Sequence, residues 1–521
     1  MQRDDMTAAA VVHDRRAGRW LALGVGAVAL ATRLGPVLAA GTLRGVHGYD
    51  DGVHLAVAQR LIAGIVPYRD DVFLHPPGIA VALAPFAALA GPFGDSWALA
   101  LARLAFMLVG TLNAILVARI LLPRGMIAAA VGGGAYALSS ATVSAEHTIY
   151  LETAIGLGLL IALGALGRVG TGSAAGSRTV SRALMVSGLA IGVAATFKIW
   201  VAIDATVLAA LVLSRWGVRA VAKWVAWCAL GAAPIIVPFL VLTPGRLWYD
   251  VVVVQSGRPV QAKSLMDRLG AVGLAEALHT TDIGLLAVLI GALLLAIVLA
   301  PLAVAVWRRT RPAAWPDPVW WGVLAAAQLA ALAVAPSFYL HYESFVAPAL
   351  CLLAGAGAGH LAAAARARGG RAGRGGVAVI VAVAVAAGLG LTVTRPPLPA
   401  EGRVDNAVLA SFAVRHRCLW VRVPAYLQVA DATARQLRER CPGSLDLVGS
   451  WLVLTSRGKI PGTAATTLDQ LEIEQLRGSD GALLEAVNPT QGLGPRSKAY
   501  LHAHFASVGR TGEIQMWSRT S

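Results

Sequence analysis

Charged residues are scarce in this chain. Asp, Glu, Lys and Arg make up 14% of its 521 residues, whereas a typical soluble protein carries about 25%. Hydrophobic residues make up 57%, and the mean hydropathy is +0.66. Apolar runs of roughly 17 to 25 residues, long enough to cross a hydrocarbon core, recur along the chain. These features exclude an ordinary soluble protein and predict an all-α polytopic membrane protein.

Cysteine is also rare. The four cysteines give no indication of a metal site. Cys228 and Cys351 fall in apolar runs, where a free cysteine behaves as a small hydrophobic residue. Cys418 and Cys441 lie in the polar C-terminal region, and a disulfide between them is expected if that region is outside the cell.

Acidic residues are outnumbered by basic ones, and the formal net charge is +16. In a soluble protein this excess would suggest a nucleic-acid partner. In a membrane protein, Lys and Arg collect in the cytoplasmic loops. The charge is therefore explained without nucleic acid.

The apolar runs predict about eleven transmembrane helices of membrane-spanning length. The first run, from Trp20 to Ala40, is longer than the apolar region of a signal peptide, and further runs follow it. The predicted spans lie at approximately 20–40, 96–122, 125–142, 149–167, 183–199, 201–214, 223–243, 283–306, 318–336, 343–362 and 376–394.

Clusters of Lys and Arg set the orientation of these spans. With the predicted count, every cluster falls on one side of the membrane, which is therefore cytoplasmic. We expect a plasma-membrane protein with its N-terminus in the cytoplasm. The clusters are Arg15, Arg16 and Arg19; Arg119 and Arg124; Arg168, Arg178 and Arg182; Arg215, Arg219 and Lys223; Arg308, Arg309 and Arg311; Arg366, Arg368, Arg371 and Arg374.

The first external loop is long and covers residues 41–95. Its segment Val53–Ile65 has apolar residues at helical spacing, which predicts an amphipathic helix in the membrane interface. Ile79–Leu89 is apolar but too short to span, so we expect a second interfacial or re-entrant helix. Pro76 and Pro77 suit the start of that helix.

The C-terminal residues 396–521 differ in character from the transmembrane domain predicted for residues 1–395. Their charges are interspersed, and the short runs Leu419–Val423 and Trp451–Thr455 are β-like, while Asp431–Arg440 is helical in pattern. This pattern predicts a small soluble α/β domain on the extracytoplasmic side.

Two adjacent acids, Asp50 and Asp51, follow the first span directly. Unpaired carboxylates beside a bilayer are costly to desolvate, so they need a reason to be there. One interpretation is an Asp-Gly turn with a helix N-cap. The other is a general base with a companion carboxylate that tunes it or helps to bind a metal. The two interpretations are compatible, because capping a helix fixes a carboxylate in place.

Further polar residues fall on the same external side. His75 is either an interfacial histidine or a group for phosphate contact, metal ligation or proton transfer. Glu146 and Glu152, between the third and fourth spans, either serve a helix macrodipole or contact an acceptor or a metal. Lys198 is either a snorkelling anchor or, like Arg258, a cation for a lipid phosphate.

The segment Ser337–Glu343 adds two tyrosines, a histidine and an acid at the external end of the ninth and tenth spans. An interfacial aromatic belt explains Tyr339 and Tyr342. It explains His341 and Glu343 less well. We expect Tyr339, His341 and Tyr342 to bind the phosphate or lipid of a donor, and Glu343 to contact an acceptor or a metal. Acids for base chemistry and cations for phosphate, converging on one face, are what transfer from a phosphate-linked donor needs.

The layout resembles the GT-C superfamily of integral membrane glycosyltransferases, especially its protein mannosyltransferases and aminoarabinose transferases. The resemblance covers about residues 1–395. It includes the family's Lys-Pro-Pro segment, in which this chain has His75 in place of the lysine. The segments that carry it are Tyr49–Gly52, Pro67–Asp70, Phe73–Gly78, Ala145–Glu152, Thr196–Lys198 and Tyr339–Pro348.

The resemblance implies a GT-C fold, a polyprenyl-phosphate-linked sugar as donor and a membrane lipid environment. The acceptor is then a glycan, glycolipid or protein on the external side. Asp50 matches the catalytic aspartate that deprotonates the acceptor hydroxyl for inverting attack, and a shift of one residue in the alignment gives that role to Asp51. A divalent metal is compatible with the superfamily but not required by it.

Two other functions compete with this one. A transporter or flippase of a lipid-linked glycan more often has interrupted helices with polar residues near mid-membrane. This chain keeps most ionisable residues at span ends, and we find no internal repeat, which favours the enzyme. A non-catalytic envelope scaffold is the third interpretation, and only loss of turnover on changing the acid pair separates it from the enzyme.

Overall fold

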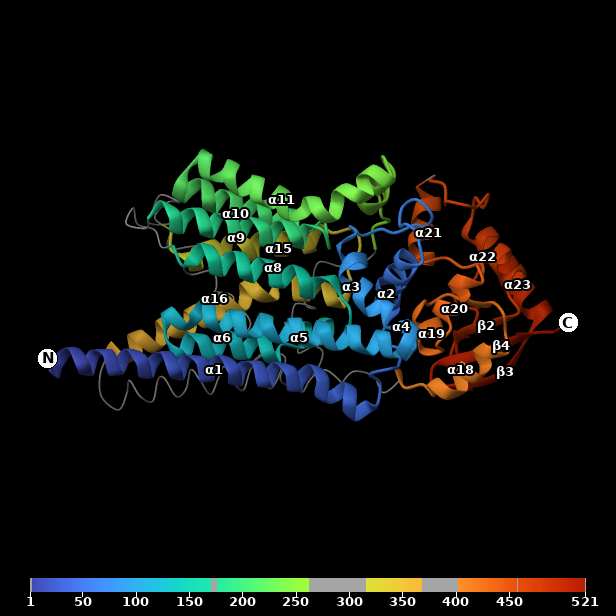
Figure 1. Ribbon diagram of the computed structural model, residues 1–521, viewed down its shortest axis with the longest axis horizontal. Coiled ribbons are helices and arrows are strands. Elements are labelled where there is room, and N and C mark those ends of the chain that lie inside the picture. The colour runs from blue at the N-terminus through green and yellow to red at the C-terminus, as the bar shows by residue number, and fades with distance from the viewer. Residues whose placement is uncertain (1, 170–175, 262–314, 368–401, 457, 521) are drawn as a thin grey trace.

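Long apolar helices run along the long axis of the molecule, and a small sheet with its own helices lies at one end, here called the sheet end (Figure 1). The structure is a computed structural model that describes residues 2–169, 176–261, 315–367, 402–456 and 458–520. The spans predicted at 283–306 and 376–394 lie outside the described residues.

The described part of the bundle accounts for the other predicted spans, each of which falls on a helix. Among the described residues, six helices are long and apolar enough to cross a membrane, or seven if the bent pair α6–α7 counts as one span. The chain is thus a multi-pass membrane protein, and the count of eleven stays a prediction. The bundle helices are α1 Gln2–Ala40, α5 Asp95–Leu121, α6 Met126–Leu138, α7 Ser140–Glu146, α8 Leu151–Gly167, α9 Ser177–Ala195, α10 Val201–Trp216, α11 Val218–Leu242, α15 Asp317–Val334 and α16 Ala347–Ala367.

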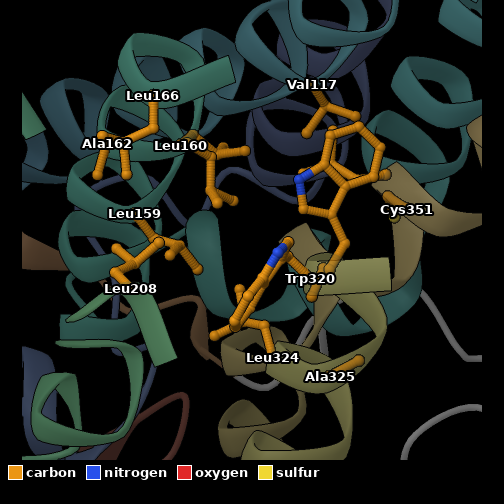
Figure 2. Close-up of a cluster of buried hydrophobic side chains, with 14 of the residues drawn as sticks. Val117, Leu159, Leu160, Ala162, Leu166, Leu208, Trp320, Leu324, Ala325 and Cys351 are labelled. Carbon is orange, nitrogen blue, oxygen red and sulfur yellow. The ribbon is translucent and has the colours of Figure 1, made fainter. Parts of the chain in front are cut away.

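The interior of the bundle is packed with apolar side chains from several helices. Figure 2 shows Trp320 of α15 among Leu159, Leu208 and Cys351 from α8, α10 and α16. Small residues allow the helices to approach closely, as is usual in membranes. A Cβ atom added at Gly192 of α9 would lie 2.0 Å from the Cys228 carbonyl oxygen of α11.

Basic loops meet at the end of the bundle opposite the sheet. Asp317, at the start of α15, accepts from Arg124 at 2.9 Å and from Arg215 at 2.8 Å. Two of the predicted basic clusters therefore lie at the same end of the bundle, as expected if both are on one side of the membrane.

The segment between α1 and α5 holds three helices: α2 Tyr49–Ile62, α3 Gly78–Ala88 and α4 Ala90–Phe93. The helix after Pro77 begins where it was predicted. The interfacial placement predicted for Val53–Ile65 is wrong for most of its length, because every residue from Asp51 to Gln59 is buried. The reason is that α2 lies between α3 and the C-terminal region, where its Gly52 lies against the backbone of Ala425.

The C-terminal region contains a four-stranded sheet of order β1-β2-β4-β3, in which β1 pairs with β2 in parallel and the other pairs are antiparallel. The strand predicted at Trp451–Thr455 is wrong, since these residues belong to helix α21, whose N-terminus is capped by Asp446. The elements are α18 Asn406–Val414, β1 Leu419–Val421, α19 Ala425–Val429, α20 Thr433–Arg438, α21 Leu447–Thr455, α22 Leu468–Arg477, β2 Gly481–Glu485, α23 Pro495–His504, β3 Phe505–Thr511 and β4 Ile514–Arg519.

The C-terminal region and the α2–α3 segment share one hydrophobic core. Leu55 of α2 and Leu83 of α3 belong to the same buried cluster as Phe412 and Leu483. Gln428 also donates to the Gly52 carbonyl oxygen at 2.8 Å. The sheet is therefore fixed against the end of the bundle rather than held on a free tether.

Candidate active site

A cavity of about 270 Å³ lies at the sheet end of the bundle, where α2, α8 and α21 meet. Its acids are Asp50, Glu152 and Asp446, and its permanent cations are Lys198 and Arg258. The polar groups that the sequence placed on one face are thus brought to one cavity from segments hundreds of residues apart.

Asp50 lies in the first turn of α2, and its carboxylate faces this cavity with 40% of the side chain exposed. Partial burial, followed by the negative charges of Asp446 and Glu152, raises its pKa above the ordinary value, while His341 and Lys198 oppose the shift. A carboxylate of raised pKa with a free approach is suited to general-base chemistry.

Asp51, its neighbour, points away from the cavity. It is 1% exposed and accepts two hydrogen bonds from Arg103, at 2.5 and 3.1 Å, and one from the Thr148 hydroxyl at 2.8 Å. Because consecutive residues on a helix are about 100° apart, one acid of the pair faces the cavity and the other faces α5. Asp51 is committed to a buried ion pair.

Lys198 and Glu152 form a buried ion pair at the cavity wall. The Lys198 ammonium also lies over two aromatic rings, 4.2 Å from the centroid of Trp200 and 4.1 Å from that of Tyr342. Glu152 Oε2 has no hydrogen-bond partner among the described residues. The wall therefore holds a desolvated cation, which aromatic faces stabilise, beside an acid with spare acceptor capacity.

Arg258 and His75 line the cavity next to Lys198. Arg258 donates to the Ser337 hydroxyl at 3.4 Å, and its Nε has no partner among the described residues. Burial, and then the nearby positive groups His54, Lys198 and Arg258, lower the pKa of His75 well below its ordinary value. His75 is thus a neutral imidazole at pH 7, and it does not replace the charge of the lysine found in the family segment.

The aromatic segment before α16 closes another side of the cavity. His341 stacks on Tyr150, with centroids 4.1 Å apart and planes 8° apart, and Tyr339 lies parallel to it at 5.9 Å. Tyr342 meets His341 edge to face at 4.8 Å. The tyrosines that a membrane belt would explain are therefore cavity residues.

Four lining residues were not foreseen. Asp446 of the C-terminal region accepts a hydrogen bond from the Tyr49 hydroxyl at 2.7 Å, and His54 donates from Nδ1 to the Ile149 carbonyl at 2.7 Å. His54 follows Asp50 by four residues, a spacing that places both on one helix face, whereas Tyr49 and Tyr150 only lie next to predicted segments in the sequence. Nothing local in the sequence marks Asp446.

Two predicted acids lie elsewhere. Glu146 is buried in the bundle, where it accepts from Arg33 at 2.5 Å and from the Tyr136 hydroxyl at 2.7 Å. Glu343 is 1% exposed and lines neither cavity of this end. Cys418 and Cys441, in the C-terminal region, form a disulfide bond.

A second cavity, of about 200 Å³, adjoins the first. The two share His75, Lys198, Arg258 and Tyr342 as a common wall. On its far side the second cavity is mainly apolar, with lining residues that include Ile199, Trp200, Ala331 and Val334. A polar chamber and an apolar one therefore meet at a wall that carries two cations.

The residues present do not form a metal site. In the described parts of the chain, no group of three or more His, Cys, Asp or Glu side chains is placed to hold a metal ion. Lys198 already occupies the position beside Glu152 that a cation would take.

Comparison with known proteins rests on structure, because no family model and no curated protein matches the sequence. The chain is similar to ArnT from Cupriavidus metallidurans bound to undecaprenyl phosphate, with a TM-score of 0.62 and 18% identity over 97% of this chain and 99% of that one. It is also similar to AglB, an archaeal oligosaccharyltransferase from Archaeoglobus fulgidus, in complex with an inhibitory peptide and a dolichol-phosphate. That TM-score is 0.56, with 11% identity over 97% of this chain and 74% of that one.

Both neighbours are GT-C proteins. This chain has the GT-C fold. The resemblance inferred from the sequence is confirmed at the level of the fold. Its predicted extent of about residues 1–395 is too short, since the GT-C similarity to ArnT covers 97% of the chain and so includes much of the C-terminal region.

Proposed function

We propose that this chain is a membrane glycosyltransferase that moves a sugar from a polyprenyl-phosphate donor to a hydroxyl group of a cell-envelope acceptor. One observation carries the proposal. Asp50, an acid with an open approach, faces the same cavity as Lys198 and Arg258, and those two cations form the wall shared with an apolar chamber. A lipid-linked phosphosugar has the matching order of groups: sugar, phosphate and apolar chain.

In this assignment the donor lies across the shared wall. Its isoprenoid chain occupies the apolar chamber beside Trp200 and Val334, and its phosphate lies against Lys198 and Arg258. Arginine suits bidentate phosphate contacts, and lysine supplies a point charge. The sugar then lies in the polar cavity, with its anomeric carbon toward Asp50. The ligands of both neighbours, undecaprenyl phosphate and dolichol-phosphate, support a donor of this class.

Asp50 is the general base of the proposed reaction. It takes the proton of the acceptor hydroxyl, whose oxygen attacks the anomeric carbon from the face opposite the phosphate. The bond between that carbon and the phosphate oxygen breaks, its electron pair stays on the phosphate, and the anomeric centre is inverted. Lys198 and Arg258 stabilise the charge that develops on the leaving phosphate, in a wall largely shielded from water.

Asp50 is favoured over Asp51 for this role because Asp51 is held by Arg103 and Thr148 and does not line the cavity. His75 supports the donor as a neutral hydrogen-bonding group. Tyr339 and Tyr342 offer aromatic faces to the sugar or the chain, and Glu152 offers its unpartnered oxygen to a sugar hydroxyl.

We assign the sheet end to the extracytoplasmic side, with residues 396–521 and the first loop outside and the N-terminus inside. Two basic clusters meet at Asp317, at the opposite end, which supports this orientation through the preference of Lys and Arg for the cytoplasm. Nucleotide sugars are normally confined to the cytoplasm, so a lipid-linked donor suits a site on this side of the plasma membrane.

The experiment is a transfer assay. Purified protein in nanodiscs is incubated with a panel of radiolabelled polyprenyl-phosphate sugars and envelope acceptor extracts, and transfer or donor hydrolysis is measured. Turnover of at least one donor by the wild type, lost in Asp50→Asn, is the expected result. Absence of turnover with every donor, in protein that binds a polyprenyl phosphate and is folded, overturns the proposal in favour of a transporter or scaffold.

A further inference from the structure

Asp50 differs from the other acids of the cavity in its partners. Glu152 is paired with Lys198, and Asp446 accepts from Tyr49 and from the Gly449 amide. Asp50 accepts no hydrogen bond from the described residues, and the ionisable side chain that lies near it is His341, whose Nε2 is 3.8 Å from Asp50 Oδ2.

Three tyrosine rings restrict the orientation of the His341 ring. Tyr150 stacks on one face at 4.1 Å, and Tyr339 lies parallel at 5.9 Å. Tyr342 contacts the ring edge to face at 4.8 Å. Tilting the imidazole out of this plane would break the parallel contacts, so the plane of the ring is restricted, and in this orientation Nε2 faces Asp50.

The separation of 3.8 Å is longer than a hydrogen bond. Hydrogen bonds between catalytic groups are often long without substrate and shorten in the substrate complex. Asp50 is 40% exposed at the side chain and His341 14%, so the carboxylate has room to move toward a ring that is fixed. Asp50 and His341 would therefore come within hydrogen-bond distance when an acceptor enters the cavity.

We propose that His341 positions the Asp50 carboxylate for proton transfer. Its Nε2–H donates to Oδ2 and leaves Oδ1 toward the acceptor hydroxyl. The proton of that hydroxyl goes to Asp50 and remains there as the bond from the anomeric carbon to the phosphate breaks. His341 gives up no proton, so it is a positioning residue. This assignment rests on the proposed function and moves His341 from the donor-binding set predicted from the sequence.

The groups that face His341 determine how the pair responds to pH. Asp50 and His54 face it from α2, Glu152 from α8, and Tyr150 from the position just before α8. Lys198 lies after α9, and Tyr339 and Tyr342 belong to the segment of His341 itself. Burial lowers the pKa of His341, with Lys198 and His54 acting in the same sense and Glu152 and Asp50 opposing them. A neutral ring at pH 7 is the form that can donate one Nε2–H without adding a charge.

Two variants separate the donor from the stack. His341→Phe keeps an aromatic ring beside Tyr150 and Tyr339 but removes Nε2, whereas His341→Gln loses the ring and returns an N–H donor at a similar reach. Loss of the donor raises the pKa of Asp50, and the base works only when deprotonated. We expect kcat to fall 10-fold or more in His341→Phe, with the acid limb of the pH–rate profile moved to higher pH, and substantial rescue in His341→Gln.

A second measurement does not depend on turnover. Histidine side chains are labelled with ¹⁵N in nanodisc samples, the His341 resonance is assigned by its loss in His341→Phe, and its titration is compared between the wild type and Asp50→Asn. We expect the midpoint to fall in Asp50→Asn, because a negative charge beside the ring has been removed. An unchanged midpoint, or an unchanged pH–rate profile in His341→Phe, overturns the pairing.

The two proposals fail in different ways. If the titration shows coupling but no donor is turned over, the pairing stands and the glycosyltransferase assignment is lost. If transfer occurs but His341 and Asp50 titrate independently, the enzyme assignment stands and His341 returns to a donor-binding role.

Discussion

The Tyr49 hydroxyl donates a hydrogen bond of 2.7 Å to Oδ1 of Asp446, a residue 397 positions further along the chain. Tyr49 is the first residue of α2, directly before Asp50, and Asp446 caps α21 in the C-terminal region. The same Tyr49 oxygen accepts from the Val448 amide at 3.1 Å. The membrane part and the C-terminal region therefore build one cavity together, and one acid of that cavity, Asp446, comes from the region that was predicted to be a separate domain.

The two adjacent acids should respond differently to the same change. Asp50→Asn removes the proposed base, so kcat should fall about 10²- to 10⁴-fold while the unfolding temperature stays near that of the wild type. Asp51→Asn should instead lower stability, because one-sided loss of a buried pair costs about 3–5 kcal/mol and here would leave the Arg103 guanidinium buried. Transfer assays and thermal unfolding in nanodiscs measure both effects. Full transfer activity in Asp50→Asn contradicts the assignment of the base.

Several features of this arrangement are readable from the sequence. Hydropathy locates the long spans, and the Pro76-Pro77 pair marks the start of α3 because a fixed φ suits a first helical turn. Asp50, Glu152, Lys198 and His341 gather in one cavity because each lies near the end of a span on the same side, which the count of spans and basic loops already implies.

Other features depend on contacts that no local pattern encodes. The sequence of helix α2 is amphipathic, yet every residue from Asp51 to Gln59 is buried, because α19 covers the helix at Gly52. Asp446 lies beside Asp50 only through the fold of the C-terminal region. The sequence does not distinguish Asp50 from Asp51. The difference comes from Arg103 of α5, which donates to Asp51 and contacts it only once the helices are packed.

The charge of Asp446 should be visible in the pH dependence of transfer. It is one of the groups that raise the pKa of Asp50, so Asp446→Asn should lower that pKa. Transfer rises with pH as Asp50 loses its proton, and the acid limb of kcat/KM should therefore move to lower pH, opposite to the shift expected for His341→Phe.

Asparagine is a suitable substitute at this position because it is as good an N-cap as aspartate, so α21 should keep its start. An Asp446→Asn variant that unfolds at the wild-type temperature and shows an unshifted acid limb would mean that the two carboxylates do not interact.

The Lys198–Glu152 pair offers a test that separates stability from donor binding. Lys198→Met should destabilise the protein by about 3–5 kcal/mol, because Glu152 is left buried without its partner. The double variant Lys198→Met/Glu152→Gln should recover most of that loss, since neither charge remains. Binding of a polyprenyl phosphate should stay weak in both variants, because the cation of the shared wall is gone.

Thermal unfolding and binding of labelled polyprenyl phosphate in nanodiscs measure the two quantities. Glu152→Gln alone is the matched control: it keeps Lys198 and should keep phosphate binding. Wild-type affinity in the double variant would show that Lys198 serves the ion pair only, and the phosphate role would then fall to Arg258.

The Cys418–Cys441 disulfide should both stabilise the C-terminal region and report its compartment. Its sequence separation is 23 residues, and closing a loop of that size stabilises a fold by about 3 kcal/mol in the chain-entropy model. Cys418→Ala/Cys441→Ala, or reduction of the wild type, should make the region more sensitive to protease. In the control Cys228→Ala/Cys351→Ala, which alters only cysteines of the bundle, the C-terminal region should respond to reductant as it does in the wild type.

The compartment is tested in cells. Because disulfides persist in oxidising compartments, rapid thiol blocking of whole cells should find Cys418 and Cys441 oxidised. A fully reduced pair in cells would place the region in the cytoplasm and reverse the orientation proposed for the site.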